Sequence, residues 1–304
     1  MLTLVINPAE GARPAEPDPC APGVNTWRSA DGQPVAFSTS QGDRRRLHWP
    51  GVATFDFSVG GNIISATPHP PVRTDLIHEA FQHSVLPLAL QALGQEAIHA
   101  SAVLTPGGVV GFCGHAEAGK STLAYALSER GYPAWSDDAV VFEVERHEAR
   151  AVRLPFAFRL RPASAAFFGR EPGLQRGSGE AGFLRAPVAA LCVLTRTAAD
   201  ADAPGFTITR LAGRDALHAI LEHALCFDWH NAASKQALLV HYLTLASAIR
   251  VFAVSIQPSL ERLSRVVDAL VDRVIAEPSR ITLANEIAIA GTRPEPAGVG
   301  GLRG

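Results

Sequence analysis

Hydrophobic and polar residues alternate in short runs near the start of the chain. These runs fill Asn25–Pro68, and turn-forming pairs such as Asp31-Gly32 and Gly60-Gly61 separate them. A period of two is typical of strands that bury one face, and glycine beside aspartate favours tight turns. We therefore expect a small antiparallel meander here. The preceding stretch, Glu10–Gly23, is rich in proline and alanine and is expected to be an irregular arm.

The pattern changes to a helical period after this meander. Apolar residues recur three and four positions apart between Thr74 and Leu93, which predicts an amphipathic helix. Thr74 or Asp75 can cap its N-terminus through a side-chain oxygen. Pro87 lacks the N–H that a regular helix would use, so we expect the helix to bend there.

Strand-like and helical segments alternate through the rest of the chain. The strand-like segments are apolar and are expected at Ala97–Leu104, Val109–Cys113, Pro133–Glu143, Val188–Thr195, Phe206–Arg210 and Val251–Ile256. The helical segments carry an apolar stripe and are expected at Lys120–Arg130, Asp215–Cys226, Asn231–Ile249 and Ser259–Ile275. Gly169–Ala186 shows no period, so we expect a long loop there.

Composition and charge narrow the class of protein. Of 304 residues, 47% are hydrophobic and 18% are charged, which allows a substantial core. The formal net charge of −2 gives no electrostatic reason to expect nucleic acid as a partner. The most apolar long segment, Ala237–Ile256, is interrupted by His241 and Arg250, so it predicts a core helix and strand and no membrane span.

The cysteines indicate a reducing compartment. None of Cys20, Cys113, Cys192 and Cys226 forms a C-x-x-C pair. Cys113 and Cys192 lie in apolar strand-like runs, where a buried free thiol is the usual state. The first residues also lack the basic region of a signal peptide. We therefore expect a cytoplasmic protein.

A phosphate-binding motif follows one of the expected strands. Residues Gly114–Thr122 read G-H-A-E-A-G-K-S-T and match G-x-x-x-x-G-K-[ST], with an apolar strand before and a helix after. In such loops backbone N–H groups and the helix N-terminus bind phosphate oxygens, while Lys120 reaches the β- and γ-phosphates and Ser121 ligates Mg²⁺. The expected nucleotide-binding residues are Gly114, His115, Ala116, Glu117, Ala118, Gly119, Lys120, Ser121 and Thr122.

Two further features stand near this loop in the sequence. Asp137 and Asp138 precede an apolar run, and adjacent carboxylates can divide the work of a phosphate site, one accepting a hydroxyl proton and the other binding metal. An exposed turn explains the pair about equally well, because aspartate favours turns. His99 lies in the strand-like run before the loop strand, where a lone histidine is more often structural.

These features together resemble one known family. The segments I-H-A-S at 98–101, G-H-A-E-A-G-K-S-T at 114–122 and G-Y-P-A-W-S-D-D-A-V-V-F-E at 131–143 are similar to the HPr kinase/phosphorylase family. They look most like its smaller HPr-kinase-like relatives, some of which are lasso-peptide precursor kinases that phosphorylate a serine. The resemblance covers residues 86–143 and extends weakly to the last strand and helix.

The resemblance implies a fold and roles for individual residues. The fold is α/β (α+β), like phosphoenolpyruvate carboxykinase, with a mixed curved sheet, a phosphate loop and flanking helices. Residues 1–95 would form the arm, meander and helix, 96–285 the kinase core and 286–304 a disordered tail. ATP and Mg²⁺ are the implied cofactors. The implied catalytic residues are Asp137 as base, His99 and Lys120, and the implied metal ligands are Ser121 and Asp138.

The chain departs from the family in one motif. True HPr kinases carry a glycine-containing motif after the aspartates that supplies a further metal carboxylate, and the sequence has none. Glu143, or nothing, takes its place. Arg159 and Arg161 stand roughly where the motif would lie, and solvated strand charges are the simpler interpretation of both. The departure leaves phosphorylase activity, and HPr as a substrate, open.

Three hypotheses for the function follow from these residues. The first is an ATP-dependent serine kinase that acts on a small protein or peptide. Under this hypothesis the protein can be a monomer or a homo-oligomer. The second is a non-catalytic ATP- or ADP-binding module that recruits a partner. The third is a small-molecule kinase, although the loop of such enzymes often opens the chain. The combination of His99, Asp137 and Asp138 favours catalysis, because a pure binding module needs no such set.

Overall fold

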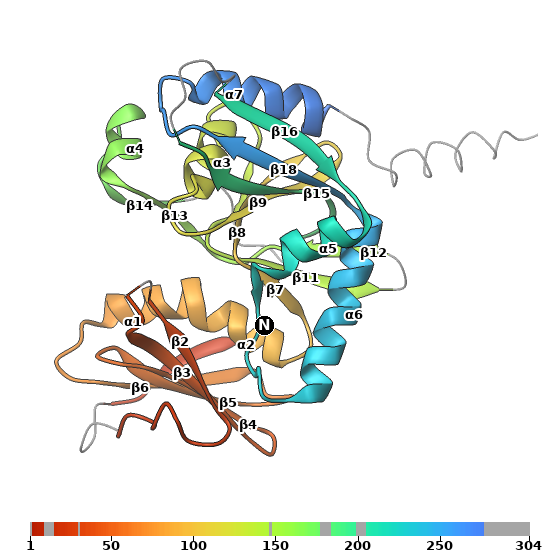
Figure 1. Ribbon diagram of the computed structural model, residues 1–304. Coiled ribbons are helices and arrows are strands. Elements are labelled where there is room, and N and C mark those ends of the chain that lie inside the picture. The colour runs from red at the N-terminus through yellow and green to blue at the C-terminus, as the bar shows by residue number, and fades with distance from the viewer. Residues whose placement is uncertain are drawn as a thin grey trace, which may run out of the picture.

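Two sheets organise the molecule, a six-stranded sheet near the N-terminus and a ten-stranded sheet built from the rest of the chain (Figure 1). The computed structural model describes residues 2–8, 15–29, 31–145, 148–176, 184–198 and 205–276. The expected tail at 286–304 and part of the expected arm lie outside the described residues.

The N-terminal sheet contains the expected meander. Its strands β2 to β6 run antiparallel in chain order and span Val24–Arg28, Pro34–Gln41, Arg44–Trp49, Ala53–Ser58 and Ile63–Pro68. A sixth strand, β1 (Thr3–Ile6), pairs parallel with β6 and was not expected. Its residues alternate only between exposed and half-buried, so the pattern there is weak. Alternate residues of the meander, among them Leu47 and Phe55, point inward and are fully buried.

One face of this sheet is covered by the expected helical segment. The segment consists of α1 (Thr74–Ala80), a π-helical turn η1 (Phe81–Val85) and α2 (Leu86–Ala92). The irregularity lies just before Pro87, where the N–H of Leu86 bonds to the carbonyl of Phe81. A wider turn at this point accommodates the proline ring, which would otherwise crowd the preceding turn.

The larger sheet is mixed, as expected for a protein of the α/β class. Its centre is formed by β9 (Gly108–Gly114), β15 (Arg185–Arg196) and β18 (Arg250–Ile256), which run parallel. The flanking strands pair antiparallel and are β7 (Glu96–Ile98), β8 (Ala100–Thr105), β10 (Ala134–Ser136), β11 (Val140–Glu145), β12 (Glu148–Val152), β16 (Phe206–Leu211) and β17 (Ala224–Leu225).

Several expected segments are divided differently in the structure. The single strand expected at Ala97–Leu104 is two strands, with a break at His99. The strand expected at Pro133–Glu143 is likewise interrupted by Asp137 and Asp138. The expected loop Gly169–Ala186 contains a strand, β14 (Gly173–Arg176), which pairs with β13 (Ala157–Leu160). Strand formation there comes from pairing with a distant segment, which periodicity cannot detect.

Helices cover both faces of the larger sheet. On one face lie α3 (Lys120–Ser128) and α7 (Leu263–Leu270), which continues into a second π-helical turn, η2 (Val271–Ile275). The other face is covered by α5 (Gly213–Leu221) and α6 (Ala232–Ala248). A short helix, α4 (Pro162–Phe167), follows β13. Within the described residues, no helix combines the length and apolar character needed to cross a bilayer.

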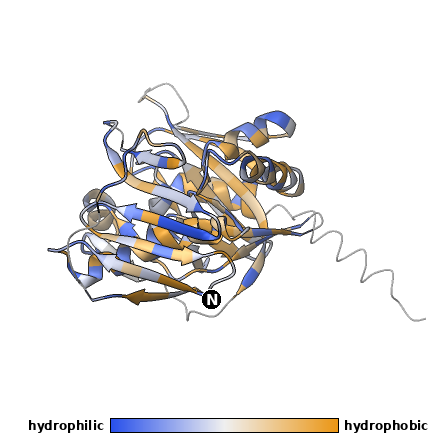
Figure 2. Cartoon of the chain, turned by 90° about the horizontal axis from the view of Figure 1, so that it is seen from below, coloured by the Kyte–Doolittle hydropathy of each residue, from blue (hydrophilic) through white to orange (hydrophobic). Residues whose placement is uncertain are grey.

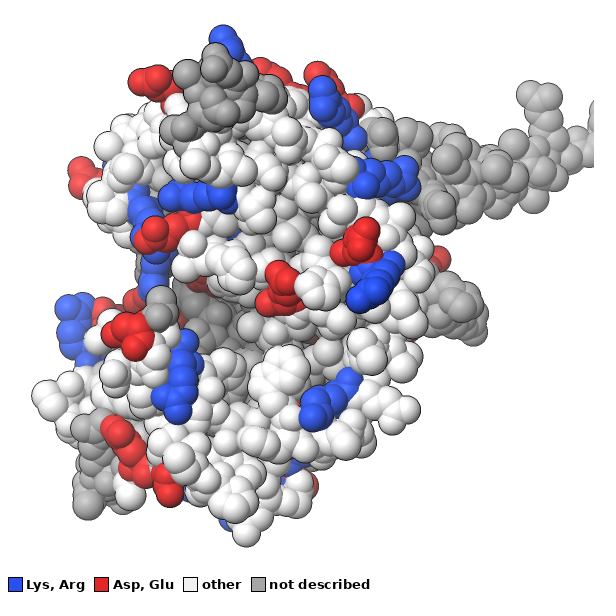
Figure 3. Space-filling view, viewed as in Figure 1, with Lys and Arg blue, Asp and Glu red and all other residues white. Residues whose placement is uncertain are grey.

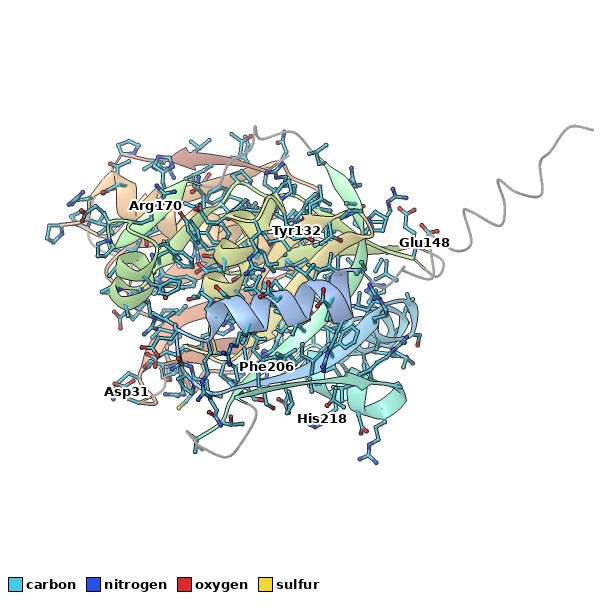
Figure 4. All side chains as sticks on the ribbon, turned by 90° about the horizontal axis from the view of Figure 1, so that it is seen from above. Asp31, Tyr132, Glu148, Arg170, Phe206 and His218 are labelled. Carbon is cyan, nitrogen blue, oxygen red and sulfur yellow. The ribbon has the colours of Figure 1, made fainter. Side chains whose placement is uncertain are left out.

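Apolar side chains fill the space between these layers. Figure 2 shows hydrophobic stretches along many strands and helices, with hydrophilic residues interspersed. Tyr132 and Phe206 close this core at its margin, on either side of α7 in the view of Figure 4. Fully buried aromatic residues such as Phe112 and Phe142 anchor the strands that carry the site.

The two sheets are joined by buried hydrogen bonds. The Asn25 side chain donates to the carbonyl of Phe227 over 3.1 Å and accepts from the N–H of Trp229 over 2.9 Å. Ser38 donates to the same Phe227 carbonyl, and the Gln91 side chain accepts from the Phe227 N–H over 2.8 Å. Phe227 itself is packed into the core of the N-terminal sheet. These contacts fix the position of the N-terminal sheet beside the larger one.

Candidate functional site

The phosphate-loop motif lies between β9 and α3, as the sequence predicts. Gly114 ends the strand with a φ of 147°, and a Cβ there would meet the Leu194 carbonyl at 2.8 Å and the Ala118 Cβ at 2.9 Å. Glu117 and Gly119 also have positive φ, of 68° and 100°. Such reversals turn successive N–H groups in one direction, which makes a concave site for anions. No side chain caps α3, so its first N–H groups lack a side-chain partner.

Lys120 is folded back over the loop. Its Nζ donates to the carbonyls of Gly114, at 2.8 Å, and of His115, at 3.1 Å. The residue is only 7% exposed. Burial lowers the pKa of its ammonium group, although the neighbouring carboxylates Asp138 and Asp137 act in the opposite direction. The ammonium group is therefore held over the backbone of the loop.

Asp137 faces the loop and is 4% exposed. Its Oδ1 accepts a hydrogen bond from Ser121 over 2.8 Å and a short one from Ser101, and its Oδ2 accepts from the backbone N–H of Arg159 over 3.1 Å. Ser121 lies in the first turn of α3, so this carboxylate is tied directly to the loop. Burial, together with the charge of Asp138, raises the pKa of Asp137.

Asp138 contacts a histidine of the helical segment, and it also lies close enough to Lys120 for the two charges to interact. Its Oδ2 contacts Nδ1 of His83 at 2.7 Å, and its side chain is 32% exposed. Burial alone would raise the pKa of Asp138, but the hydrogen bond and charge of His83, with smaller effects of His99 and Lys120, lower it. The same contact raises the pKa of His83. Asp138 also adopts a φ of 65°, which is uncommon outside glycine.

His99 supports the turn between β10 and β11. Its Nδ1 lies 2.7 Å from the carbonyl of Asp138, and because a carbonyl only accepts, Nδ1 carries the proton. Burial and the charge of Lys120 lower the pKa of His99, so the ring is neutral near pH 7. Its backbone N–H bonds to the carbonyl of His223, whose ring stacks edge-on against His115 of the loop at 5.4 Å. Burial, the nearby His115 and then His99 lower the pKa of His223 to about 4.

A cavity of about 520 Å³ opens beside Asp138. Asp138, His83, His99 and Arg159 line one end of it. The other walls come from the N-terminal sheet and the helix that covers it, including Trp27 and Trp49. In the space-filling view the surface is hollowed between these two parts of the molecule (Figure 3). A larger hollow of about 630 Å³ lies along Arg44–Arg46 of the N-terminal sheet and contains none of the residues around the loop.

The structure brings together most, but not all, of the residues that the sequence singled out. Arg161 forms an ion pair with Glu117 of the loop, and Arg159 pairs with Glu79 of α1, so neither is a freely solvated strand charge. Glu143 is held by Arg185, at 2.8 Å, and by Gln95, at 2.7 Å. Both of its oxygens are therefore engaged away from Asp137 and Asp138.

Sequence reasoning missed two residues that contact the aspartates. Ser101 lies two positions after His99, and residues two apart on a strand share a face, so that signal was available. His83 comes from the helix that covers the N-terminal sheet, 55 positions before Asp138. Its helix shows only an apolar stripe in the sequence, so local pattern gives no sign of the contact.

Comparison with known proteins does not establish the family of this protein. No protein-family model matches the chain, and no curated protein matches it. Among solved structures, the HPr(Ser) kinase/phosphatase from Coxiella burnetii is similar over 66% of this chain and 99% of that chain, with 12% sequence identity and a TM-score of 0.32. Similarity at this level is no basis for an activity, which has to come from the chemistry of the site.

Proposed function

We propose that this protein is an ATP-dependent kinase that phosphorylates a serine hydroxyl of a small protein or peptide. One observation carries the proposal. Adjacent carboxylates beside a phosphate-loop motif face two different places, because Asp137 is bonded to Ser121 of the loop helix and Asp138 faces a cavity. A nucleotide-binding module needs the first arrangement, whereas phosphoryl transfer to a second substrate needs both.

The loop residues would hold the triphosphate. The N-terminus of α3 and the backbone around Glu117 and Gly119 supply N–H groups for phosphate oxygens. Lys120 would exchange its two carbonyl contacts for the β- and γ-phosphates. The exposed loop residues His115, Ala116 and Glu117 leave this surface open to a ligand.

Ser121 and Asp137 fit a magnesium ion. They offer a hydroxyl and a carboxylate oxygen that already lie 2.8 Å apart, and Mg²⁺ prefers such hard oxygen ligands. Among the described residues no cluster of three or more His, Cys, Asp or Glu side chains forms a metal cage, which agrees with an ion held mainly by substrate phosphates. When bound, the ion would neutralise charge that develops on the transferring phosphoryl group.

The geometry supports an assignment of the two aspartates opposite to the one that the family resemblance implies. Asp137 is the metal ligand in this proposal, because it is buried and bonded to Ser121. Asp138 is the base, because it is half-exposed and lines the cavity. His99 is a positioning residue that holds the Asp138 carbonyl, and through it the unusual backbone turn.

Proton and bond changes balance across this arrangement. The serine oxygen forms a bond to the γ-phosphorus as the bond from that phosphorus to the bridging oxygen of ADP breaks. ADP leaves with the electron pair of the broken bond. The hydroxyl proton passes to the Asp138 carboxylate, which its hydrogen bond to His83 keeps ionised and oriented.

The test compares Asp138→Asn with the matched variant Asp215→Asn, an exposed carboxylate on α5. With radiolabelled ATP and serine peptides, Asp138→Asn should lower kcat by about 10²- to 10⁴-fold, the usual cost of losing a general base. Its ATP affinity, measured by calorimetry, should stay unchanged, and Asp215→Asn should match the wild type. Equal transfer of label by Asp138→Asn and wild type would show that Asp138 is not the base. Tight ATP binding by all variants with no labelled acceptor would favour the non-catalytic module.

A further inference from the structure

The cavity beside Asp138 is built by both parts of the molecule. Its far wall is apolar and is formed by Trp27, Trp49, Val52, Leu76, Leu88 and Leu225. Trp27 and Trp49 come from the N-terminal sheet, and Leu76 lies on α1 with 44% of its surface exposed. An exposed leucine beside two half-buried tryptophans is an unusual concentration of apolar surface for a site that opens to solvent.

The cavity is separate from the expected nucleotide site. None of its lining residues belongs to the loop Gly114–Gly119 or to α3. It adjoins the expected nucleotide site through Asp138 and His99, both of which interact electrostatically with Lys120. At about 520 Å³ it lies within the roughly 300–1,000 Å³ range of small-ligand sites, far more than one serine side chain needs.

The charges that line the cavity are paired with one another. Asp138 contacts His83, and Glu79 contacts Arg159. Each acidic group is thus matched by a basic one, so the cavity offers little field to attract a strongly charged ligand. An apolar group that enters would instead gain from burial against the tryptophan and leucine side chains.

We infer that this cavity is the acceptor pocket and that it selects peptides with a large apolar side chain, such as phenylalanine or leucine, next to the phosphorylated serine. The inference rests on the proposed kinase function for the phosphorylation step, but the binding preference stands on the pocket alone. It also gives the N-terminal sheet a role, because its two tryptophans would contact the apolar side chain of the acceptor peptide.

The test uses synthetic serine peptides of equal length that differ only at the residues flanking the serine, with phenylalanine, leucine, alanine, aspartate or lysine there. Binding is followed by fluorescence polarisation of labelled peptides, and transfer by label from ATP. The variants are Trp49→Ala and Leu76→Glu. Leu239→Glu on α6 is the matched control, since Leu239 is 49% exposed and does not line the cavity.

Wild type should bind and label the phenylalanine and leucine peptides about tenfold or more better than the alanine peptide, and the charged peptides least. Leu76→Glu should abolish that preference with ATP affinity and melting temperature unchanged, and Leu239→Glu should behave as wild type. Trp49→Ala should weaken binding of the phenylalanine and leucine peptides. If Trp49→Ala fails to fold, Leu76→Glu alone still tests the pocket. Equal use of all peptides, a preference for charged ones, or equal effects of Leu76→Glu and Leu239→Glu would overturn the pocket.

The two proposals can fail separately in this experiment. A preference for apolar peptides in binding, lost in Leu76→Glu, without any transfer of label would support the pocket and contradict the kinase. Transfer of label without a preference among the peptides would support the kinase and contradict the pocket. Neither binding preference nor transfer would contradict both.

Discussion

Adjacent aspartates become chemically different residues because each has different neighbours. Asp137 is buried among hydroxyl and backbone donors, and burial with the neighbouring charge raises its pKa. Asp138 is half-buried, and the hydrogen bond and charge of His83 lower its pKa. A bound cation beside Asp137 would favour its ionised form, since opposite charges stabilise each other at close range. In the proposed kinase, this difference would let Asp137 hold a metal ion and Asp138 accept a proton.

The contact between His83 and Asp138 should make stability depend on pH. The folded-state pKa of His83 is raised above 6.5, so the contribution of the pair is fully present below 6.5 and is lost as pH rises through the raised value. His83→Asn should therefore lower the free energy of unfolding more at a pH below 6.5 than at one well above the raised value. Urea unfolding at the two pH values measures this.

The matched control for that experiment is His78→Asn, because His78 is an exposed histidine of the preceding turn in the same helical segment. It should not reproduce the loss of stability that His83→Asn causes at the lower pH. In transfer assays, His83→Asn should also move the acidic limb of the kcat/KM profile to higher pH, since Asp138 loses the hydrogen bond and charge that lower its pKa. A deficit in stability that stays constant with pH would show that His83 is not charged in the pair.

Lys120 should dominate nucleotide affinity. Lys120→Ala removes a charge-assisted contact to phosphate, so we expect ATP affinity to fall by about 1.5–3 kcal/mol. Calorimetry measures the change directly. Lys235→Ala, at an exposed position on α6, is the control and should leave affinity unchanged. Equal affinity of Lys120→Ala and wild type would refute a phosphate-binding role for the loop.

At the scale of elements, the junction of β9 and α3 depends on Gly114. Its φ is 147°, and a Cβ added to it would lie 2.8 Å from the Leu194 carbonyl oxygen, so there is no room for a side chain. Gly114→Ala should therefore lower the free energy of unfolding by about 1–3 kcal/mol through backbone strain, and should weaken ATP binding by displacing the loop. Thermal unfolding and calorimetry test the two effects.

Gly107→Ala is the control for that substitution. Gly107 lies in the turn before β9, has no left-handed φ, and a Cβ there would meet only the Thr105 hydroxyl at 3.9 Å. It should be tolerated, and the loss of glycine's flexibility in the unfolded chain can even stabilise the protein slightly. Similar losses of stability for both variants would show that the effect of Gly114→Ala does not come from backbone strain in the loop.

The elements that carry their own periodic or motif signal were predictable from the sequence. The strand β9, the loop and α3 form one local unit, and the meander alternates with clear turns. The break at His99 was not predicted, because apolar residues flank this histidine on both sides, whereas a turn at Asp137–Asp138 was left as an alternative to a catalytic pair. Each break depends on contacts between distant segments, such as His99 with the Asp138 carbonyl. The contact of His83 with Asp138 could not be predicted for the same reason.

At the scale of the whole molecule, the proposed acceptor pocket requires two sheets to keep a fixed relation. The tryptophan wall comes from the N-terminal sheet, whereas Asp138 comes from the larger sheet. The joint between the two sheets is a set of buried hydrogen bonds. In it the Asn25 side chain donates to the Phe227 carbonyl and accepts from the Trp229 N–H. A weaker joint should therefore affect the acceptor more than the nucleotide, because the loop lies wholly within the larger sheet and its helices.

Asn25→Ala tests this relation. The Phe227 carbonyl keeps its bond from Ser38, but the Trp229 N–H loses its partner, so we expect unfolding to be easier by about 1–3 kcal/mol. Asn62→Ala, the same substitution at an exposed position, should change stability by no more than about 0.5 kcal/mol. If the pocket spans both sheets, Asn25→Ala should also raise KM for the apolar serine peptide while ATP affinity stays constant. An equal loss of affinity for both substrates would mean that the joint stabilises the whole protein and does not specifically shape the acceptor pocket.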